Sequence, residues 1–234
     1  AKDLLYDYVY DLIVPAGELL STQIISSWMR ESGIPHQLLD AREYILTDHT
    51  YREGKVLWDL SAQKILDVIP CILEKGQWVI TQGFIGGTTD HKSVTLGREG
   101  SDYSAAIFSN ILDAEACFIW KDVPGLMNAD PKRMPEARKI ERISYGEAIE
   151  LAYYGASVIH PKTLKPLQNK GIPLYVKSFM DPDSTGTEIG EESVEARECS
   201  YIFKDDQALV SISPKDYSFI AEDNIYAIFG FISR

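Results

Sequence analysis

A short glycine-rich stretch, TLGREGSDYSAA at residues 95–106, combines residue types that could bind a charged small molecule. Arg98 and Asp102 stand on either side of Gly100, and glycine lets a ligand approach the main chain closely. The arginine fork fits a carboxylate or a phosphate, whereas an acidic side chain suits an ammonium group. The pair therefore predicts a site for a zwitterion, and an amino acid is the natural candidate.

A helix is predicted to begin at this stretch. Ser101 occupies the expected N-cap position, so the free N–H groups of the helix would face the loop. Ser101 and Asp102 are also good capping residues by themselves, which leaves a purely structural role open. Glu18, beside Gly17, is a second carboxylate that could meet an ammonium group or could simply favour a helix dipole.

Another group of polar residues follows a predicted strand, in IWKDVPGLMNADPKR at 119–133. Open α/β sheets bind ligands where their strands end. Lys121, Lys132 and Arg133 could hold phosphate groups, and Asp122 could meet a ribose hydroxyl or a metal. Taken alone, the same residues are equally consistent with ordinary surface charges.

The elements that must position these residues alternate along the chain. Strands separated by helices imply parallel pairing with right-handed crossovers. We therefore expect an α/β fold, a mainly parallel sheet sandwiched by helices. Apolar spacing predicts helices at 4–13, 18–33, 58–76, 101–112, 144–156 and 161–171, and strands at 36–41, 77–87, 116–120 and 172–178.

Charge and composition exclude several classes of protein. The 234 residues include 35 acidic and 23 basic ones, for a formal net charge of -12. This balance argues against a nucleic-acid partner or an anionic membrane surface. No apolar run approaches the roughly 18 to 20 residues of a membrane span, and no signal-peptide pattern begins the chain. A cytoplasmic protein is the simplest interpretation.

Cysteine and histidine give no sign of a metal site. Cys71, Cys117 and Cys199 are too scattered for a disulfide framework and too few for a zinc site, which favours a reducing compartment. His160 stands alone before a proline and is expected to be structural. We predict no metal bound by protein ligands alone.

Five motifs in order resemble aspartokinase, a branch of the amino-acid kinase superfamily. They are VITQGFIGG, TLGREGSDYSAA, IWKDVPGLMNADP, ELAYYGASVIHP and IPLYVKSF. The resemblance implies an amino-acid kinase catalytic domain at 1–193. It also implies a linker at 194–234 that leads into an α+β ACT regulatory domain, whose opening strand and helix the tail resembles.

The resemblance implies transfer of the ATP γ-phosphoryl group to the β-carboxylate of L-aspartate, with Mg2+ bridging the phosphates, in lysine, threonine and methionine biosynthesis. A homo-oligomer is also implied. Arg98 and Asp102 would be the catalytic residues. The implied substrate-binding residues are Glu18, Phe84, Arg98, Ser101 and Asp102. The implied nucleotide-binding residues are Lys121, Asp122, Gly125, Met127, Lys132, Arg133 and Ser157.

Three departures from the family pattern affect these expectations. The family's KFGGTS strand and loop is absent, so the chain is expected to be truncated at both ends and inactive as it stands. Ser157 replaces a lysine, and Lys92 or Lys121 is a candidate to compensate. Lys132 replaces an arginine, which keeps the charge but loses the fork. The alternatives are a non-catalytic amino-acid sensor or a kinase of glutamate or acetylglutamate.

Overall fold

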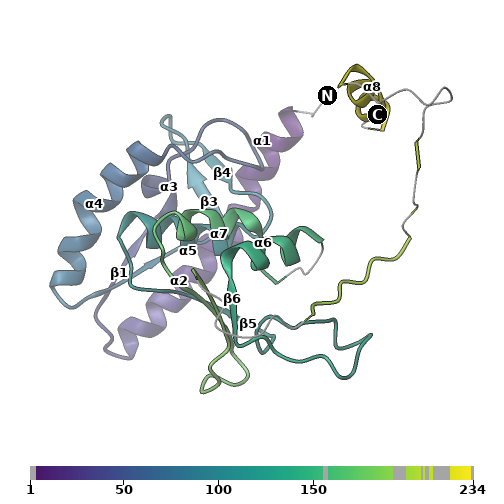
Figure 1. The fold of residues 1–234 in the computed structure, drawn as a ribbon. Helices are drawn as coiled ribbons and strands as arrows, with labels where there is room; N and C mark the ends of the chain where they lie inside the picture. Colours follow the sequence, from purple (N-terminus) through teal and green to yellow (C-terminus); the bar gives the residue numbers. More distant parts are fainter. Residues whose placement is uncertain are drawn as a thin grey trace. The chain divides into compact units, whose positions relative to one another are not determined.

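The computed structural model describes residues 4–154, 158–191, 199–206, 208, 211–212 and 222–232 (Figure 1). Its backbone divides into two compact units, Ala1–Phe203 and Lys204–Arg234. The elements of the first unit are α1 (Leu4–Ile13), α2 (Pro15–Glu31), β1 (His36–Leu39), α3 (Ala41–Tyr44), α4 (Trp58–Glu74), β2 (Trp78–Thr81), β3 (Ile85–Gly87), β4 (Ser93–Thr95), α5 (Gly100–Ile111), β5 (Cys117–Lys121), β6 (Arg142–Ser144), α6 (Tyr145–Tyr154), α7 (Pro161–Gln168), β7 (Leu174–Ser178) and β8 (Thr187–Gly190).

The strands form mixed sheets rather than one parallel sheet. The pairs β1–β2, β5–β7 and β6–β8 are parallel, as the alternation with helices predicts. The pairs β3–β4 and β7–β8 are antiparallel. No helix separates the strands within either antiparallel pair, so a short connection reverses the chain direction. The α/β class is confirmed.

The apolar run at 77–87 forms two strands, so the prediction of a single strand there is wrong. Phe84, between β2 and β3, has a φ of 69°, a left-handed conformation that interrupts extended backbone. β2 pairs with β1, whereas β3 pairs with β4. The break therefore sends the chain from one sheet to another at the position of a predicted site residue.

Helix α5 contacts both hydrophobic clusters of the first unit. Tyr103, Ile107 and Ile111 pack in a cluster with Ile65 and Ile69 of α4. On another face of α5, Ala106 joins the cluster that contains residues of β5, β7 and β8. Figure 1 shows α5 and α7 together at the centre of this unit, where they pack against one another. The start of α5 is therefore fixed relative to both halves of the fold.

Asp11 connects α1 to the strand that leads into the glycine loop. Its carboxylate is fully buried. It accepts hydrogen bonds from the backbone N–H groups of Arg52 (2.7 Å) and Thr95 (3.0 Å), and from the Thr95 hydroxyl (2.7 Å). The acid thus satisfies two backbone donors, of which the Thr95 N–H is buried.

Replacing Asp11 with alanine is expected to lower the free energy of unfolding by about 2 kcal/mol, because the buried N–H and hydroxyl of Thr95 lose their acceptor. Urea unfolding followed by circular dichroism measures the change. The matched control is Leu12→Ala, at an exposed neighbouring position, which is expected to change stability by less than about 0.5 kcal/mol. Equal midpoints for the two variants would contradict the structural role of Asp11.

The second unit contains helix α8 (Glu222–Ile232) within the expected ACT-like tail. The strand expected before this helix falls mostly on residues outside those that the structure describes. Among the described helices, none is both long enough and apolar enough to cross a membrane.

Candidate functional site

The glycine loop at 95–100 folds as a tight turn with two residues in the left-handed region. Gly97 has a φ of 81°, and Glu99 has a φ of 52°. Glu99 is the N-cap of α5, so the prediction of Ser101 as the N-cap is wrong. The left-handed turn starts the helix two residues earlier than the sequence indicates. Ser101 therefore lies in the first turn, with its side chain exposed.

Arg98 stands on this turn with an exposed side chain. In the described part of the chain, no acidic side chain forms an ion pair with its guanidinium group. An exposed arginine fork on a rigid turn is available for a carboxylate or phosphate ligand. This arrangement fits the predicted role of Arg98.

Phe84 and Gly83 pack directly against the start of α5. A Cβ atom on Gly83 would lie 2.9 Å from Ser101 Cα, and one on Gly100 would lie 2.7 Å from Phe84 Cδ2. The Leu96 N–H donates to the Phe84 carbonyl at 2.8 Å. Two predicted substrate-binding residues, Phe84 and Ser101, are therefore held side by side by close backbone contact.

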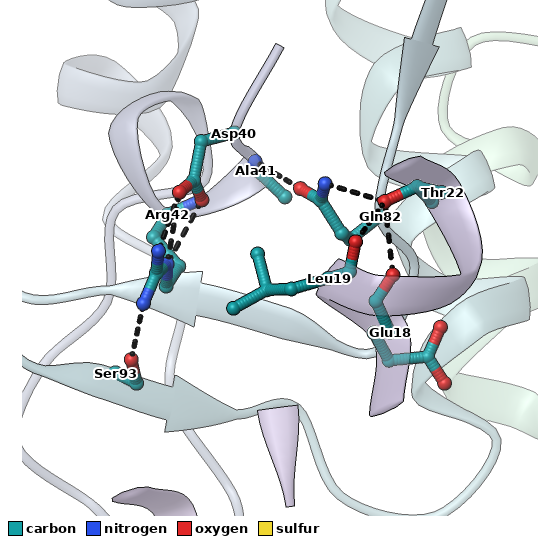
Figure 2. Close-up of polar contacts among 8 residues, drawn as sticks. All are labelled: Glu18, Leu19, Thr22, Asp40, Ala41, Arg42, Gln82 and Ser93. Atoms are coloured by element: carbon teal, nitrogen blue, oxygen red, sulfur yellow. Dashed lines mark hydrogen bonds and ion pairs between the residues drawn. The ribbon is translucent and has the colours of Figure 1, made fainter. Parts of the chain in front are cut away.

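Glu18 connects to this region through Gln82, which is not among the residues predicted from sequence (Figure 2). The Gln82 amide is buried and donates to Thr22 Oγ1 at 2.8 Å, while its oxygen accepts from Ala41 N–H at 2.8 Å. Thr22 Oγ1 in turn donates to the Glu18 carbonyl at 2.9 Å. Figure 2 shows the Glu18 carboxylate pointing away from this network, and none of the network's hydrogen bonds reaches it.

Gln82 thus fixes α2 relative to the Phe84 loop. Replacing it with leucine is expected to lower the free energy of unfolding by about 1.5 kcal/mol, because the Ala41 N–H loses its acceptor. It should also raise the KM for an amino-acid substrate more than the KM for ATP. Thermal unfolding and steady-state kinetics measure the two effects. Gln37→Leu is the control, since the Gln37 side chain bonds only to Gln77 among the described side chains. Equal changes in stability and in the two KM values for both variants would contradict the proposed role of Gln82.

Lys162 is a second residue that the sequence predictions do not include, although it directly follows the motif ELAYYGASVIHP. Its ammonium group donates to the Leu96 carbonyl at 2.9 Å and lies 4.6 Å from the centre of the Tyr103 ring. Burial lowers the pKa of this group, and the nearby Glu53 partly opposes the shift. Lys162 therefore links α7 to the glycine loop through the Leu96 carbonyl.

His160 has the structural role that its isolation predicts. It is the N-cap of α7, and its Nδ1 atom accepts a hydrogen bond from the Lys162 N–H at 3.1 Å. A ring nitrogen that accepts this bond is occupied with capping the helix.

Lys121 connects the predicted nucleotide-binding residues to the glycine loop. It is the last residue of β5, and its Nζ atom lies 2.8 Å from Oδ2 of Asp102 in the first turn of α5. The same ammonium group donates to the Val158 carbonyl at 2.6 Å. A cation from one predicted subsite thus contacts an acid from the other.

The loop after β5 is shaped by Gly125. Its φ is 145°, and a Cβ atom there would lie 2.4 Å from Thr187 Oγ1. The same hydroxyl accepts from the Leu126 N–H at 2.8 Å and donates to the Ile140 carbonyl at 2.6 Å. Met127 follows, in a β-bridge with Lys139. Only glycine fits where this loop crosses β8.

The remaining predicted nucleotide-binding residues lie at the surface. Asp122, Lys132 and Arg133 are exposed. The Arg133 guanidinium lies 5.6 Å from the centre of the Phe203 ring. Ser157 falls outside the residues that the structure describes.

Two lysines were candidates to replace the charge absent at Ser157. The Lys92 ammonium pairs with Asp90 at 2.9 Å, and neighbouring groups hold the pKa of that carboxyl well below its usual range. The Lys121 ammonium instead contacts the carbonyl of Val158, the residue directly after Ser157. The contacts therefore favour Lys121.

Neither a metal cluster nor an apolar hollow between α4, β2 and α5 marks the site. In the described ranges, no group of three or more His, Cys, Asp or Glu side chains could hold a metal ion. A hollow of about 510 Å³ lies between α4, β2 and α5, and none of the predicted site residues lines it. The charged groups, rather than cavity volume, locate the site.

Comparison with known proteins gives a consistent result. Residues 2–178 match the model of the amino acid kinase family. Over 179 residues the chain is 39% identical to lysine-sensitive aspartokinase 3 of Escherichia coli K12, covering 76% of the chain and 39% of that protein. It is 36% identical over 188 residues to a bifunctional aspartokinase/homoserine dehydrogenase of Buchnera aphidicola, covering 80% of the chain and 23% of that protein.

Solved structures agree. The crystal structure of E. coli aspartokinase III in complex with aspartate and ADP matches with a TM-score of 0.76 and 35% identity, over 80% of this chain and 42% of that one. The structure of the same enzyme with lysine and aspartate matches with a TM-score of 0.73 and 34% identity, over 80% and 42%. The chain thus spans less than half the length of these relatives.

Proposed function

Because the chain belongs to the amino acid kinase family, we propose that its protein is an aspartokinase, which transfers the γ-phosphoryl group of ATP to the β-carboxylate of L-aspartate. The observation that carries the proposal is the 2.8 Å contact between Lys121 and Asp102. It brings a cation suited to phosphate next to an acid suited to an ammonium group. The similarity to an aspartokinase solved with aspartate and ADP supports the same conclusion.

In the proposed aspartate site, the Arg98 guanidinium binds a substrate carboxylate. Asp102 and Glu18 face the substrate ammonium group. Phe84 and Ser101, packed together at the start of α5, form the wall on which the substrate lies. An exposed arginine and a mostly buried aspartate give the two ends of the amino acid different environments, which fixes its orientation.

In the proposed ATP site, Lys121 contacts the phosphates from the end of β5. The remaining proposed contacts come from the loop after that strand and from one position before α7. These residues are Asp122, Gly125, Met127, Lys132, Arg133 and Ser157. The close packing of Gly125 on Thr187 supports this proposal, because it gives the loop a fixed backbone.

When bound, Mg2+ supplies charge neutralisation and orientation of the phosphate oxygens. The residues fit a cation held mainly by phosphates and water, since Mg2+ in kinases commonly takes only one or two carboxylates. Asp122, exposed at the end of β5, is the nearest candidate in sequence to Lys121.

The chain's own residues act by position and charge rather than as a covalent nucleophile. Arg98 and Asp102 hold the amino acid, so that its β-carboxylate can attack in line. Lys121 and the N-terminal N–H groups of α5 stabilise negative charge that develops on the transferred group. The substrate carboxylate is itself the nucleophile, so no proton must be removed from it.

A wider role follows from the same proposal. We place the enzyme in the cytoplasm, in lysine, threonine and methionine biosynthesis, and we propose that it forms a homo-oligomer. Residues 1–193 would be its catalytic domain, and residues 194–234 would be the linker and start of an ACT regulatory domain.

The test is the release of ADP by the full-length protein with a panel of amino acids. Aspartate is expected to stimulate ADP formation in the presence of Mg2+, whereas glutamate and acetylglutamate are not. The alternative of a non-catalytic sensor, which Ser157 motivates, predicts tight aspartate binding with no ADP release. Stimulation by glutamate in place of aspartate would instead support the other amino-acid kinases.

A further inference from the structure

The ion pair between Lys121 and Asp102 is shielded from water. Its side chains are only 22% and 15% exposed, whereas the Arg142–Glu188 pair on β6 and β8 is 52% and 29% exposed. Shielded charges interact more strongly than surface charges, and each is costly to leave without a partner. The pair is therefore a strong link across the site.

Asp102 depends on this link. Apart from the ion pair, Oδ2 of Asp102 is buried and accepts no hydrogen bond from the described residues. A buried carboxylate without a compensating cation is strongly destabilised. Asp102 therefore needs either Lys121 or another cation in its place.

Lys121 is held on its other side by a neutral acceptor. Its ammonium group has three donors, of which one reaches the Val158 carbonyl, while Asp102 Oδ2 lies 2.8 Å from the nitrogen as its ion-pair partner. The carbonyl anchors the ammonium group whether or not the ion pair with Asp102 is kept. The ammonium group can therefore pair with another anion in place of Asp102 and still stay bound to the Val158 carbonyl.

We propose, on the basis of the proposed function, that the two ligands exchange the partners of this ion pair and thereby bind cooperatively. The ammonium group of the amino acid replaces Lys121 as the partner of Asp102. A phosphate group of ATP replaces Asp102 as the partner of the Lys121 ammonium group. Either ligand alone leaves one charge uncompensated, because only one half of the pair then has a new partner. With both ligands present, both charges are satisfied.

The test measures the dissociation constant of aspartate by titration calorimetry on the full-length protein, with and without saturating AMP-PNP and Mg2+. The nucleotide analogue is expected to tighten aspartate binding about tenfold, within the range common for coupled sites, and aspartate to tighten analogue binding equally. In Lys121→Met the coupling factor is expected to fall to about one. Lys121→Arg keeps the charge and is expected to retain coupling above about threefold.

Lys177→Met is the matched control, because Lys177 is the register partner of Trp120 on the neighbouring strand and its ammonium lies 5.1 Å from the centre of that ring. It is expected to keep the full coupling factor. Should Lys121→Met fail to fold, the double variant Lys121→Met, Asp102→Asn removes both charges and is expected to fold with a coupling factor of about one.

A wild-type protein without coupling would overturn the proposal, as would a Lys121→Met or double variant that keeps tenfold coupling. Failure of the proposed function has a different signature, since it requires that the wild type form no ADP in the presence of aspartate.

Discussion

Replacing Arg98 with alanine is expected to raise the KM for aspartate about 100-fold, while the KM for ATP changes less than about threefold. A hydrogen bond between charged groups is worth up to about 3 kcal/mol, which corresponds to a factor of this size. Steady-state kinetics with the full-length enzyme, varying each substrate in turn, measures both constants.

The structure explains why this variant should remain folded. The Arg98 side chain is exposed, and none of the acidic residues in the described ranges pairs with it. Arg98→Lys keeps the charge without the fork and is expected to raise the aspartate KM about tenfold. Arg142→Ala removes an exposed arginine far along the chain on β6 and serves as the control. Equal effects of Arg98→Ala on both KM values would contradict its role.

Gly125→Ala is expected to lower the free energy of unfolding by about 4 kcal/mol, which combines backbone strain with overpacking. The φ of 145° is nearly inaccessible to alanine, and its Cβ would lie 2.4 Å from Thr187 Oγ1. Moving Thr187 would also disturb its hydrogen bonds to Leu126 and Ile140. Thermal unfolding should show a decrease in Tm of about 10 °C for a domain of this size.

Gly17→Ala is the matched control for this prediction. Gly17 lies in α2, where an added Cβ has no neighbour within 4 Å. Alanine there is expected to increase stability by about 0.5 kcal/mol, because it restricts the unfolded chain and favours the helix. A Gly125→Ala variant as stable as wild type would show that the loop does not cross β8 as described.

Local features of the fold could be predicted from sequence because they follow from spacing. The helical periodicity of 4–13 and the apolar run at 172–178 correspond to α1 and β7. The left-handed turn at Glu99 could not be predicted, since glutamate rarely adopts that conformation. The N-cap was misplaced for this reason.

The contacts that join the site depend on long-range packing. Lys121 and Asp102 are 19 positions apart in the printed sequence, and only the packing of α5 against β5 brings their charges together. Gln82 lies within the motif VITQGFIGG, but the motif does not reveal its role, because that role depends on partners in two helices, α2 and α3. Sequence motifs can indicate that such residues matter, but not which atoms they contact.

The most direct test of the central claim is to trap the product of the full-length protein with hydroxylamine. If ATP phosphorylates the side-chain carboxylate of aspartate, hydroxylamine converts the acyl phosphate to aspartate β-hydroxamate, which mass spectrometry and comparison with a standard identify. We expect the β-hydroxamate to form in proportion to ADP. ADP formation without any hydroxamate, or hydroxamate from glutamate but not aspartate, would contradict the proposed function.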